Sequence, residues 1–153
     1  MLTKTRDTQK PVLFTTGYEG RTPKELVTLL KQYGINQLVD VRELAISRKK
    51  GFAKTALSEI LRENNIQYKH LPELGSPRKL RHELRKDKDY EKFFKAYSKT
   101  LTTPEARDKL YELNTLARGQ QTAIMCFEKD AERCHRKIIY QTLIKSGYSI
   151  SHL

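Results

Sequence analysis

The amino-acid sequence predicts a single α/β domain in which a mostly parallel sheet of about five strands is flanked by helices. Three observations predict this fold. Short apolar runs alternate with longer segments of helical periodicity, the length of 153 residues is typical of one domain, and neither an internal repeat nor a linker interrupts the chain. We place the domain at residues 11–153 and expect residues 1–10 to form a flexible basic N-terminus.

The first strand and the first helix have clear boundary residues. The apolar run at residues 12–16 is rich in β-forming side chains and stops at Gly17, which is typical of a buried strand. Thr22 and Pro23 then predict a helix start, because threonine caps helices and proline favours their first turn. The apolar positions that follow recur at helical spacing as far as Gly34, so the helix is expected to end there.

The same pattern of strand, loop and helix is repeated in the next segment. Residues 37–41 are expected to form a strand, residues 54–64 a helix, and residues 67–71 a third strand. Strands that alternate with helices in this way are typically parallel and joined by crossover helices, which favours a parallel sheet.

Residues 76–118 contain no strand pattern and are expected to be a helical insertion. Apolar periodicity indicates two helices in it. The first covers residues 90–97, and Thr103 and Pro104 open the second. The charged segment 78–88 is also interpreted as helical.

The last third of the chain returns to the alternating pattern. Residues 121–127 are the strongest late strand, and a helix over residues 134–146 follows, with Gly147 as its C-cap. Residues 148–153 complete the sheet. The whole arrangement predicts a Rossmann-like or flavodoxin-like layering of helices on a sheet.

The chain is strongly basic, with 30 Lys and Arg residues against 18 Asp and Glu residues and a net charge of +12. Two segments concentrate the charge: residues 42–54 hold five basic residues and one acidic residue, and residues 78–88 hold six and two. A positive surface attracts phosphate-rich partners, so DNA or RNA is the expected partner and a phosphate-bearing ligand is a further candidate. The alternative is that the basic residues serve solubility alone.

No segment approaches the roughly 20 apolar residues that span a bilayer, and the first ten residues contain no apolar signal-peptide core. We therefore expect a cytoplasmic protein without a membrane partner. In that reducing compartment Cys126 and Cys134 are expected to be thiols. Two cysteines are too few for a disulfide scaffold or for a four-cysteine zinc site.

Polar residues follow each of the first four predicted strands. Parallel strands end at the same edge of a sheet, where ligands gather, so these loops should converge. Among them, Arg42, Arg48 and Arg136 follow three different strand ends and are expected to form an anion site. The full set of candidate residues for binding an anion or nucleic acid is Tyr18, Arg42, Arg48, Lys49, Lys50, His70, His135 and Arg136.

The same loops supply four candidate catalytic residues, which are Cys134, Asp40, Glu73 and Glu128. Cys134 lies at the predicted start of a helix, beside His135 and Arg136. The helix dipole and the positive charges there favour its thiolate, which makes it the more reactive of the two cysteines. A purely structural role for Cys134 is the alternative.

The three carboxylates are candidate proton donors or acceptors. For Asp40, a buried salt bridge with Arg42 is the alternative, since buried charges normally pair. Cys126 ends an apolar strand and is expected to belong to the core.

Neither a metal ion nor a cofactor is expected. Cys134 and His135 are adjacent on the predicted helix and would point about 100° apart, which makes it awkward for both to bind one ion. A cysteine-phosphatase or sulfur-transferase loop needs an arginine about six residues after the cysteine, whereas Arg136 comes too early. The first strand also lacks the Gly-Lys-Ser/Thr ending of a P-loop.

Several short motifs occur together in a fixed order. They are Gly17-Tyr18-Glu19-Gly20, Asp40-Val41-Arg42, Ser47-Arg48, residues 70–75, Cys126 with Glu128, and Cys134-His135-Arg136. In this combination, from about Leu13 to Leu153, the chain resembles the domain-of-unknown-function 488 family. The resemblance implies a compact bacterial or archaeal α/β domain and these site residues, but no established reaction. Residues 42–46 depart from the family, whose members often carry a proline before the Ser-Arg pair.

The basic segments and the convergent polar loops together favour a nucleic-acid-binding or nucleic-acid-processing protein with an anion-binding cluster at the carboxyl edge of the sheet. Two alternatives use one observation each. A small-molecule enzyme of phosphoryl or sulfur chemistry would use Cys134 or a carboxylate. A non-catalytic binding module would use the charge alone.

Overall fold

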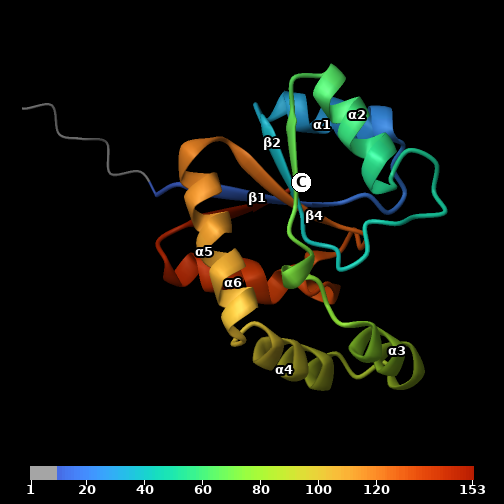
Figure 1. Cartoon of the computed structure of the whole chain (residues 1–153), viewed down its shortest axis with the longest axis vertical. Coiled ribbons are helices and arrows are strands. Elements are labelled where there is room, and N and C mark those ends of the chain that lie inside the picture. Colours follow the sequence, from blue (N-terminus) through green and yellow to red (C-terminus); the bar gives the residue numbers. More distant parts are fainter. Residues whose placement is uncertain (1–9) are drawn as a thin grey trace, which may run out of the picture.

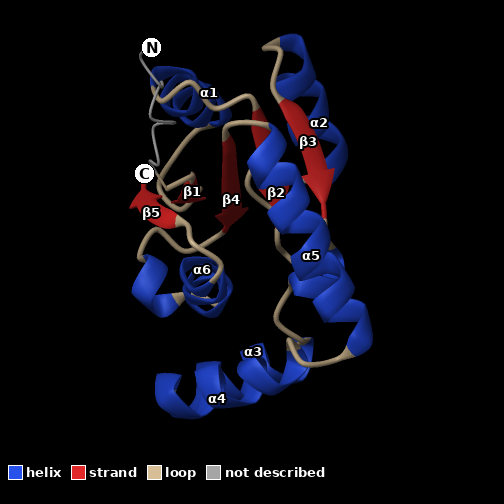
Figure 2. Cartoon of the chain, turned by 90° about the vertical axis from the view of Figure 1, so that its left-hand side faces the viewer, coloured by secondary structure: helices blue, strands red, loops and turns tan. Residues whose placement is uncertain are grey.

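A five-stranded parallel sheet forms the centre of the protein, of which the computed structural model describes residues 10–153. The strands are β1 (Val12–Gly17), β2 (Gln37–Asp40), β3 (Gln67–His70), β4 (Thr122–Cys126) and β5 (Ser149–His152). Their order in the sheet is β3-β2-β4-β1-β5, as Figure 2 shows from one edge to the other, and each neighbouring pair is parallel. The N-terminus that was expected to be flexible lies, except for Lys10, outside the described residues.

Helices cover both faces of the sheet. They are α1 (Pro23–Gln32), α2 (Lys54–Glu63), α3 (Arg78–Asp87), α4 (Tyr90–Thr100), α5 (Pro104–Gly119) and α6 (Arg136–Lys145). In Figure 1, α1 and α2 lie on one side of the sheet and α5 and α6 on the other, while α3 and α4 lie beyond α6. None of the helices in residues 10–153 is both long and apolar enough to cross a membrane. The α/β fold predicted from the sequence is confirmed.

The core has two halves because successive side chains of a strand point to opposite faces of the sheet. In β4, Ala123 and Met125 face the layer of α1 and α2, whereas Ile124 and Cys126 face α4, α5 and α6. β4 is buried along its whole length. The central strand therefore reads as an unbroken apolar run, which is typical of a parallel sheet.

Two helix starts that the sequence predicts are confirmed by their capping hydrogen bonds. Thr22 Oγ1 accepts from the amide of Glu25 at the start of α1, and Thr103 Oγ1 accepts from the amide of Ala106 at the start of α5. Each cap satisfies an amide that the helix itself leaves without a partner.

The last predicted helix needs a correction. It was expected from residue 134, but α6 begins at Arg136. A short 3₁₀ turn, η2 (Ala131–Arg133), precedes it, and Cys134 follows that turn with extended backbone angles of φ −135° and ψ 146°. Cys134 therefore lies before the helix and not in it.

The carboxyl ends of β1 to β4 lie at one edge of the sheet, which we call the carboxyl edge. The chain leaves β2 for α2 on one face and leaves its neighbour β4 for α6 on the opposite face. Ligands of parallel α/β proteins bind at such points of divergence. The polar residues after β2 and β4 meet there.

Candidate functional site

Three side chains with metal-binding or nucleophilic chemistry meet at the end of β4. We call Cys126, Cys134 and His135 the thiol cluster. Both sulfur atoms approach the same ring nitrogen, with His135 Nδ1 at 3.6 Å from Cys126 Sγ and 3.8 Å from Cys134 Sγ. All three atoms lie within 4.8 Å of one another, and all three residues are buried.

The local backbone explains why these residues meet. Cys126 is the last residue of β4 and points to the α6 side of the sheet. The η2 turn reverses the chain, so that Cys134 returns in an extended conformation to the strand that it left. His135 is the N-cap of α6 and already has helical backbone angles, of φ −58° and ψ −23°, whereas Cys134 before it is extended. Because the two residues do not share a helix, the 100° separation expected from the sequence does not apply.

A backbone carbonyl fixes the protonation of the His135 ring. Nε2 lies 2.7 Å from the carbonyl oxygen of Val41, which follows β2. A carbonyl oxygen only accepts hydrogen bonds, so Nε2 carries a proton and donates it. Nδ1, which faces the two sulfurs, carries the free electron pair while the ring is neutral. Burial opposes protonation of the ring, but the neighbouring Cys134 outweighs it and raises the pKa of His135, so the ring takes up a second proton more readily than an ordinary histidine. The ring also packs edge to face against Tyr97, at 5.2 Å between ring centroids.

The surroundings shift the pKa values of the two thiols in opposite directions. Burial opposes ionisation of Cys134, but a hydrogen bond from Cys126 and the positive charges of His135 and Arg136 hold the pKa of the Cys134 thiol well below its usual range. The pKa of Cys126 is raised, because its hydrogen bond to Cys134 and its burial both favour the neutral thiol. The direction for Cys134 agrees with the sequence analysis, although its cause is the cluster and not a helix start.

Glu128 extends the cluster by one carboxylate. Burial and the nearby Cys134 raise its pKa to about 7. Its buried Oε2 has no hydrogen-bond partner within residues 10–153. A buried oxygen without a partner is rare in proteins, and it marks a place where a proton, a water or a ligand is accommodated.

Arg136 shapes the loop that carries Glu128. It is 1% exposed, and its guanidinium group donates to the carbonyl oxygens of Glu128 at 2.5 Å and of Lys129 at 3.1 Å. The same loop presses against Gly17 at the end of β1, where a Cβ atom would lie 1.8 Å from the Glu128 carbonyl oxygen. Only glycine fits at this position, which gives a physical reason for the glycine after the first strand.

A second buried network lies beside the thiol cluster at the end of β2. Asp40 binds Arg42 through both carboxylate oxygens, at 2.9 and 2.7 Å, and accepts a third hydrogen bond from Tyr68 at 2.5 Å. Arg42 also donates to the Tyr18 hydroxyl and to the Phe52 carbonyl oxygen. Asp40 is thus the buried salt-bridge residue that the sequence analysis weighed against a catalytic role.

The remaining candidate residues are more exposed than these two networks. Arg48 and Lys50 are exposed, and Lys49 is half-buried with its ammonium donating to the Tyr18 carbonyl oxygen. His70 donates from Nε2 to the Arg42 carbonyl oxygen at 2.7 Å. Glu73 is exposed in the turn η1 (Pro72–Leu74) and makes no hydrogen bond to the thiol cluster.

The expected anion site of Arg42, Arg48 and Arg136 does not form as one group. Arg42 and Arg136 are buried and bound to acceptors of the protein itself, while Arg48 lies at the surface. The two buried arginines organise the loops, because their donors satisfy carbonyl and carboxylate oxygens that the fold would otherwise leave unpaired.

Cys126 is the residue that the sequence analysis left out of the site. It was assigned to the core, and it is indeed buried, but its sulfur faces His135. Its position as the last residue of a central parallel strand was the available signal, since such positions face ligand sites. Tyr97 and Tyr68, which come from segments far away in the chain, carried no such signal.

One family model covers most of this arrangement. The family described as Domain of unknown function DUF488 matches residues 22–143. The chain belongs to this family. The DUF488 match includes the thiol cluster, Glu128 and the Asp40–Arg42 pair, whereas β1 and β5 lie outside it. No curated protein and no solved structure matches the chain.

Proposed function

We propose that this DUF488 protein binds nucleic acid through a basic surface at the carboxyl edge. The surface, which we call the basic rim, consists of the exposed residues Arg48, Lys50, Arg78, Lys79, Arg85 and Lys86. Its two halves come from the loop between β2 and α2 and from α3. The observation that carries the proposal is that these two separate basic segments are joined.

Glu43 and Gly75 join the two segments. Their backbones touch so closely that a Cβ atom on Gly75 would lie 2.1 Å from the Glu43 amide nitrogen. Arg81 of α3 forms an ion pair with Glu43 at 3.2 Å. These two contacts fix the start of α3 against the β2–α2 loop, so the two basic segments adjoin there.

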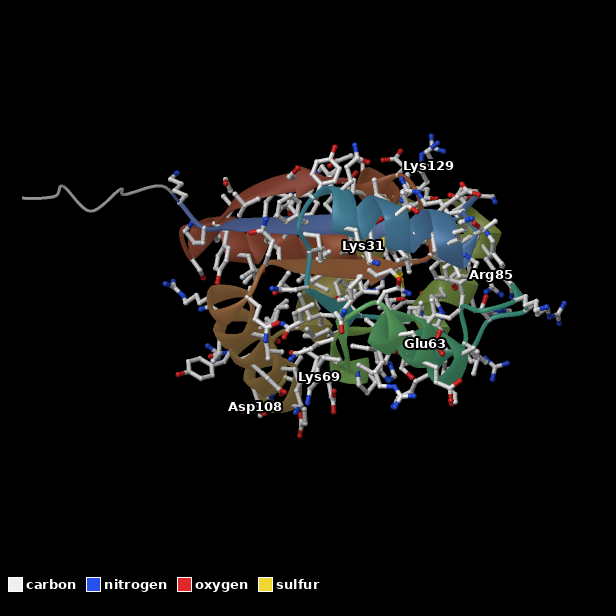
Figure 3. The ribbon with its side chains drawn as sticks, turned by 90° about the horizontal axis from the view of Figure 1, so that it is seen from above. Lys31, Glu63, Lys69, Arg85, Asp108 and Lys129 are labelled. Atoms are coloured by element: carbon white, nitrogen blue, oxygen red, sulfur yellow. The ribbon has the colours of Figure 1, made fainter. Side chains whose placement is uncertain are left out.

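The arrangement of charge supports a polyanion as the ligand. Figure 3 shows Arg85 of α3 and Lys129 near the same end of the molecule, whereas Asp108 lies toward the other end. α3 has no buried residue, so its charged side chains serve the surface and not the core. Contacts between lysine or arginine and phosphates release bound counterions, which makes the affinity steeply dependent on salt.

The test compares two triple variants of equal net charge. Arg48→Ala/Lys50→Ala/Arg78→Ala removes three residues of the basic rim. Lys31→Ala/Arg62→Ala/Lys145→Ala removes three exposed bases from the last turns of α1, α2 and α6, which run back from the carboxyl edge. Binding to labelled duplex DNA, single-stranded DNA and duplex RNA is measured by fluorescence anisotropy from about 50 to 200 mM salt.

We expect the wild type and the control variant to bind with similar affinities. The affinity of the rim variant should be at least tenfold lower. Its plot of log K against log salt should be shallower, with a slope smaller in magnitude by about 2 to 3, in proportion to the lost phosphate contacts. Absence of binding at the lowest salt, or an equal loss in both variants, would contradict the proposal. The three nucleic acids show which one the surface prefers.

A further inference from the structure

We propose that the thiol cluster is a zinc site, in which Cys126, Cys134 and His135 bind one Zn²⁺ ion and Glu128 supplies the fourth ligand. Thiolate sulfur and imidazole nitrogen are typical ligands of Zn²⁺ in proteins. Three of the four proposed ligand residues, the members of the thiol cluster, already have their donor atoms close together. The proposal goes beyond nucleic-acid binding and does not depend on it.

The distances between the donor atoms match a tetrahedral ion. Zinc binds sulfur at about 2.3 Å and imidazole nitrogen at about 2.05 Å, and a tetrahedral angle then separates these two donors by about 3.6 Å. The two nitrogen–sulfur distances in the cluster are 3.6 and 3.8 Å. A small movement of side chains therefore completes the geometry, and the backbone stays in place.

The hydrogen bond from His135 to Val41 prepares the ring for a metal. Histidine ligands of metal ions normally donate their other ring N–H to a carbonyl or carboxylate oxygen, which fixes the ring orientation and the tautomer. Here Nε2–H donates to the Val41 carbonyl oxygen and leaves the electron pair of Nδ1 directed at the sulfurs. This bond also ties the proposed site to the end of β2, so the ion would lie between the carboxyl ends of β2 and β4.

Glu128 provides a second and independent observation. Its Oε2 is the one buried side-chain nitrogen or oxygen atom of residues 10–153 without a hydrogen-bond partner. Glu128 follows Cys126 by two residues, on the loop that Arg136, the neighbour of His135, holds through the Glu128 carbonyl oxygen. A cation at this place would satisfy that oxygen.

The donor set selects the class of ion. Two thiolates and an imidazole favour Zn²⁺ over Mg²⁺ or Ca²⁺, which prefer oxygen ligands. Zinc brings no redox chemistry of its own and prefers four ligands, which is the number that the cluster and Glu128 provide. Binding would release the thiol protons, so the affinity should rise with pH.

The first measurement is the metal content of the protein as purified without chelator, together with the visible spectrum after zinc is replaced by cobalt. We expect about one zinc per chain and, with Co²⁺, the intense visible bands of tetrahedral coordination together with a thiolate-to-cobalt charge-transfer band. A content below about a tenth of an ion per chain, combined with the weak bands of octahedral cobalt, would overturn the proposal.

Variants then assign the ligands. Cys134→Ser and Cys126→Ser should each lower zinc affinity at least a hundredfold, and Glu128→Gln should lower it about tenfold to a hundredfold. Glu73→Gln and His82→Gln alter exposed residues of the same chemical types outside the cluster and should retain full metal content. Full zinc binding by Cys134→Ser would contradict the site.

Loss of a buried thiol can also unfold the protein, so wild-type protein provides a separate readout. Zinc should protect both thiols from alkylation, and a chelator should remove that protection while the circular dichroism spectrum keeps its helical signal. Equal alkylation rates with and without bound zinc would exclude the two sulfurs as ligands. Wild-type cobalt bands and protection from alkylation decide the outcome even where no cysteine variant folds.

Discussion

The pair Asp40–Arg42 shows most directly how a single residue supports the site. Both side chains are almost fully buried, and each oxygen of the carboxylate binds the guanidinium group. Replacing Arg42 by leucine leaves the charge of Asp40 buried without its partner. We expect Arg42→Leu to lower the free energy of unfolding by about 3 to 5 kcal/mol, measured by urea denaturation at neutral pH.

A second substitution separates lost charge pairing from lost packing. In Asp40→Asn/Arg42→Leu a neutral amide replaces the buried carboxylate. Part of the stability lost in Arg42→Leu should therefore return, even though the arginine is still missing. A double variant as unstable as the sum of both single variants would show that the two residues act independently. It would also show that the buried charge is not what destabilises Arg42→Leu.

His152 gives a prediction for the dependence of stability on pH. Its Nδ1 accepts a hydrogen bond from the Thr15 hydroxyl, to which Arg136 also donates. Although His152 is exposed at the surface, partial desolvation of its ring and the charge of Arg136 lower its pKa below 6.5, against a weaker opposite effect of Glu132 and Asp130. The unfolded chain therefore takes up a proton at a higher pH than the folded protein does.

The sign of the effect follows from this difference in bound protons. The stability contributed by neutral His152 is present above about pH 6.5 and is lost as the pH falls through its lower folded value. His152→Gln should flatten the decline of the urea midpoint between about pH 7 and pH 5, whereas His82→Gln on the surface of α3 should leave the slope unchanged. If the urea midpoint of His152→Gln declines with falling pH as steeply as that of the wild type, His152 does not cause the pH dependence.

At the residue scale, sequence reasoning identified single groups better than their contacts. Cys134, His135 and Glu128 were selected because they follow strand ends, and Cys134 and His135 meet Cys126 near the carboxyl ends of β2 and β4. What Cys126 contacts depends on the η2 turn, and three residues of 3₁₀ helix leave no periodic pattern in a sequence. The exposed position of Glu73 likewise depends on tertiary packing.

At the scale of elements, the close contact between the β3–α3 connection and the β2–α2 loop leaves no room for a side chain at Gly75. Gly75 has ordinary extended backbone angles of φ −72° and ψ 153°, so an alanine there suffers from crowding alone. We expect Gly75→Ala to lower the free energy of unfolding by about 3 kcal/mol, because its Cβ atom would collide with the Glu43 backbone. Thermal and urea unfolding measure the change.

Gly119 is the matched control for that substitution. It ends α5, and a Cβ atom there would meet nothing within 4 Å. Gly119→Ala should be neutral or raise stability by up to about 1 kcal/mol, since alanine favours helices more than glycine does. Equal losses in both variants would mean that the crowding at Glu43 is not the cause.

The elements were predicted to different degrees, for physical reasons. α1 and α5 carry threonine caps followed by proline and were found with their first residues correct. α3 lacks buried residues, so apolar periodicity did not reveal it and its charge pattern alone indicated a helix. The start of α6 was placed two residues early, because the short η2 turn and the extended Cys134 that follows it leave no signal in the sequence.

At the scale of the whole molecule, alternation of strands and helices was sufficient to predict a parallel sheet, and five strands were found. The order of the strands was not predicted, because pairing between distant segments leaves no local signal. The order determines the site: it brings β4 between β1 and β2, and with it Cys126 beside the end of β2. A different order of the same strands would separate the cluster.

This central position of β4 has a consequence for biosynthesis. β1 and β2 follow each other in the chain, yet they never pair, since each lies against β4. In a nascent chain emerging from the ribosome, the edges of β1 and β2 that face β4 therefore stay unpaired until residues 122–126 have been made, although the other edge of β2 can already pair with β3. Unpaired strand edges promote aggregation, so this protein should depend on molecular chaperones most strongly during the synthesis of its helical middle section.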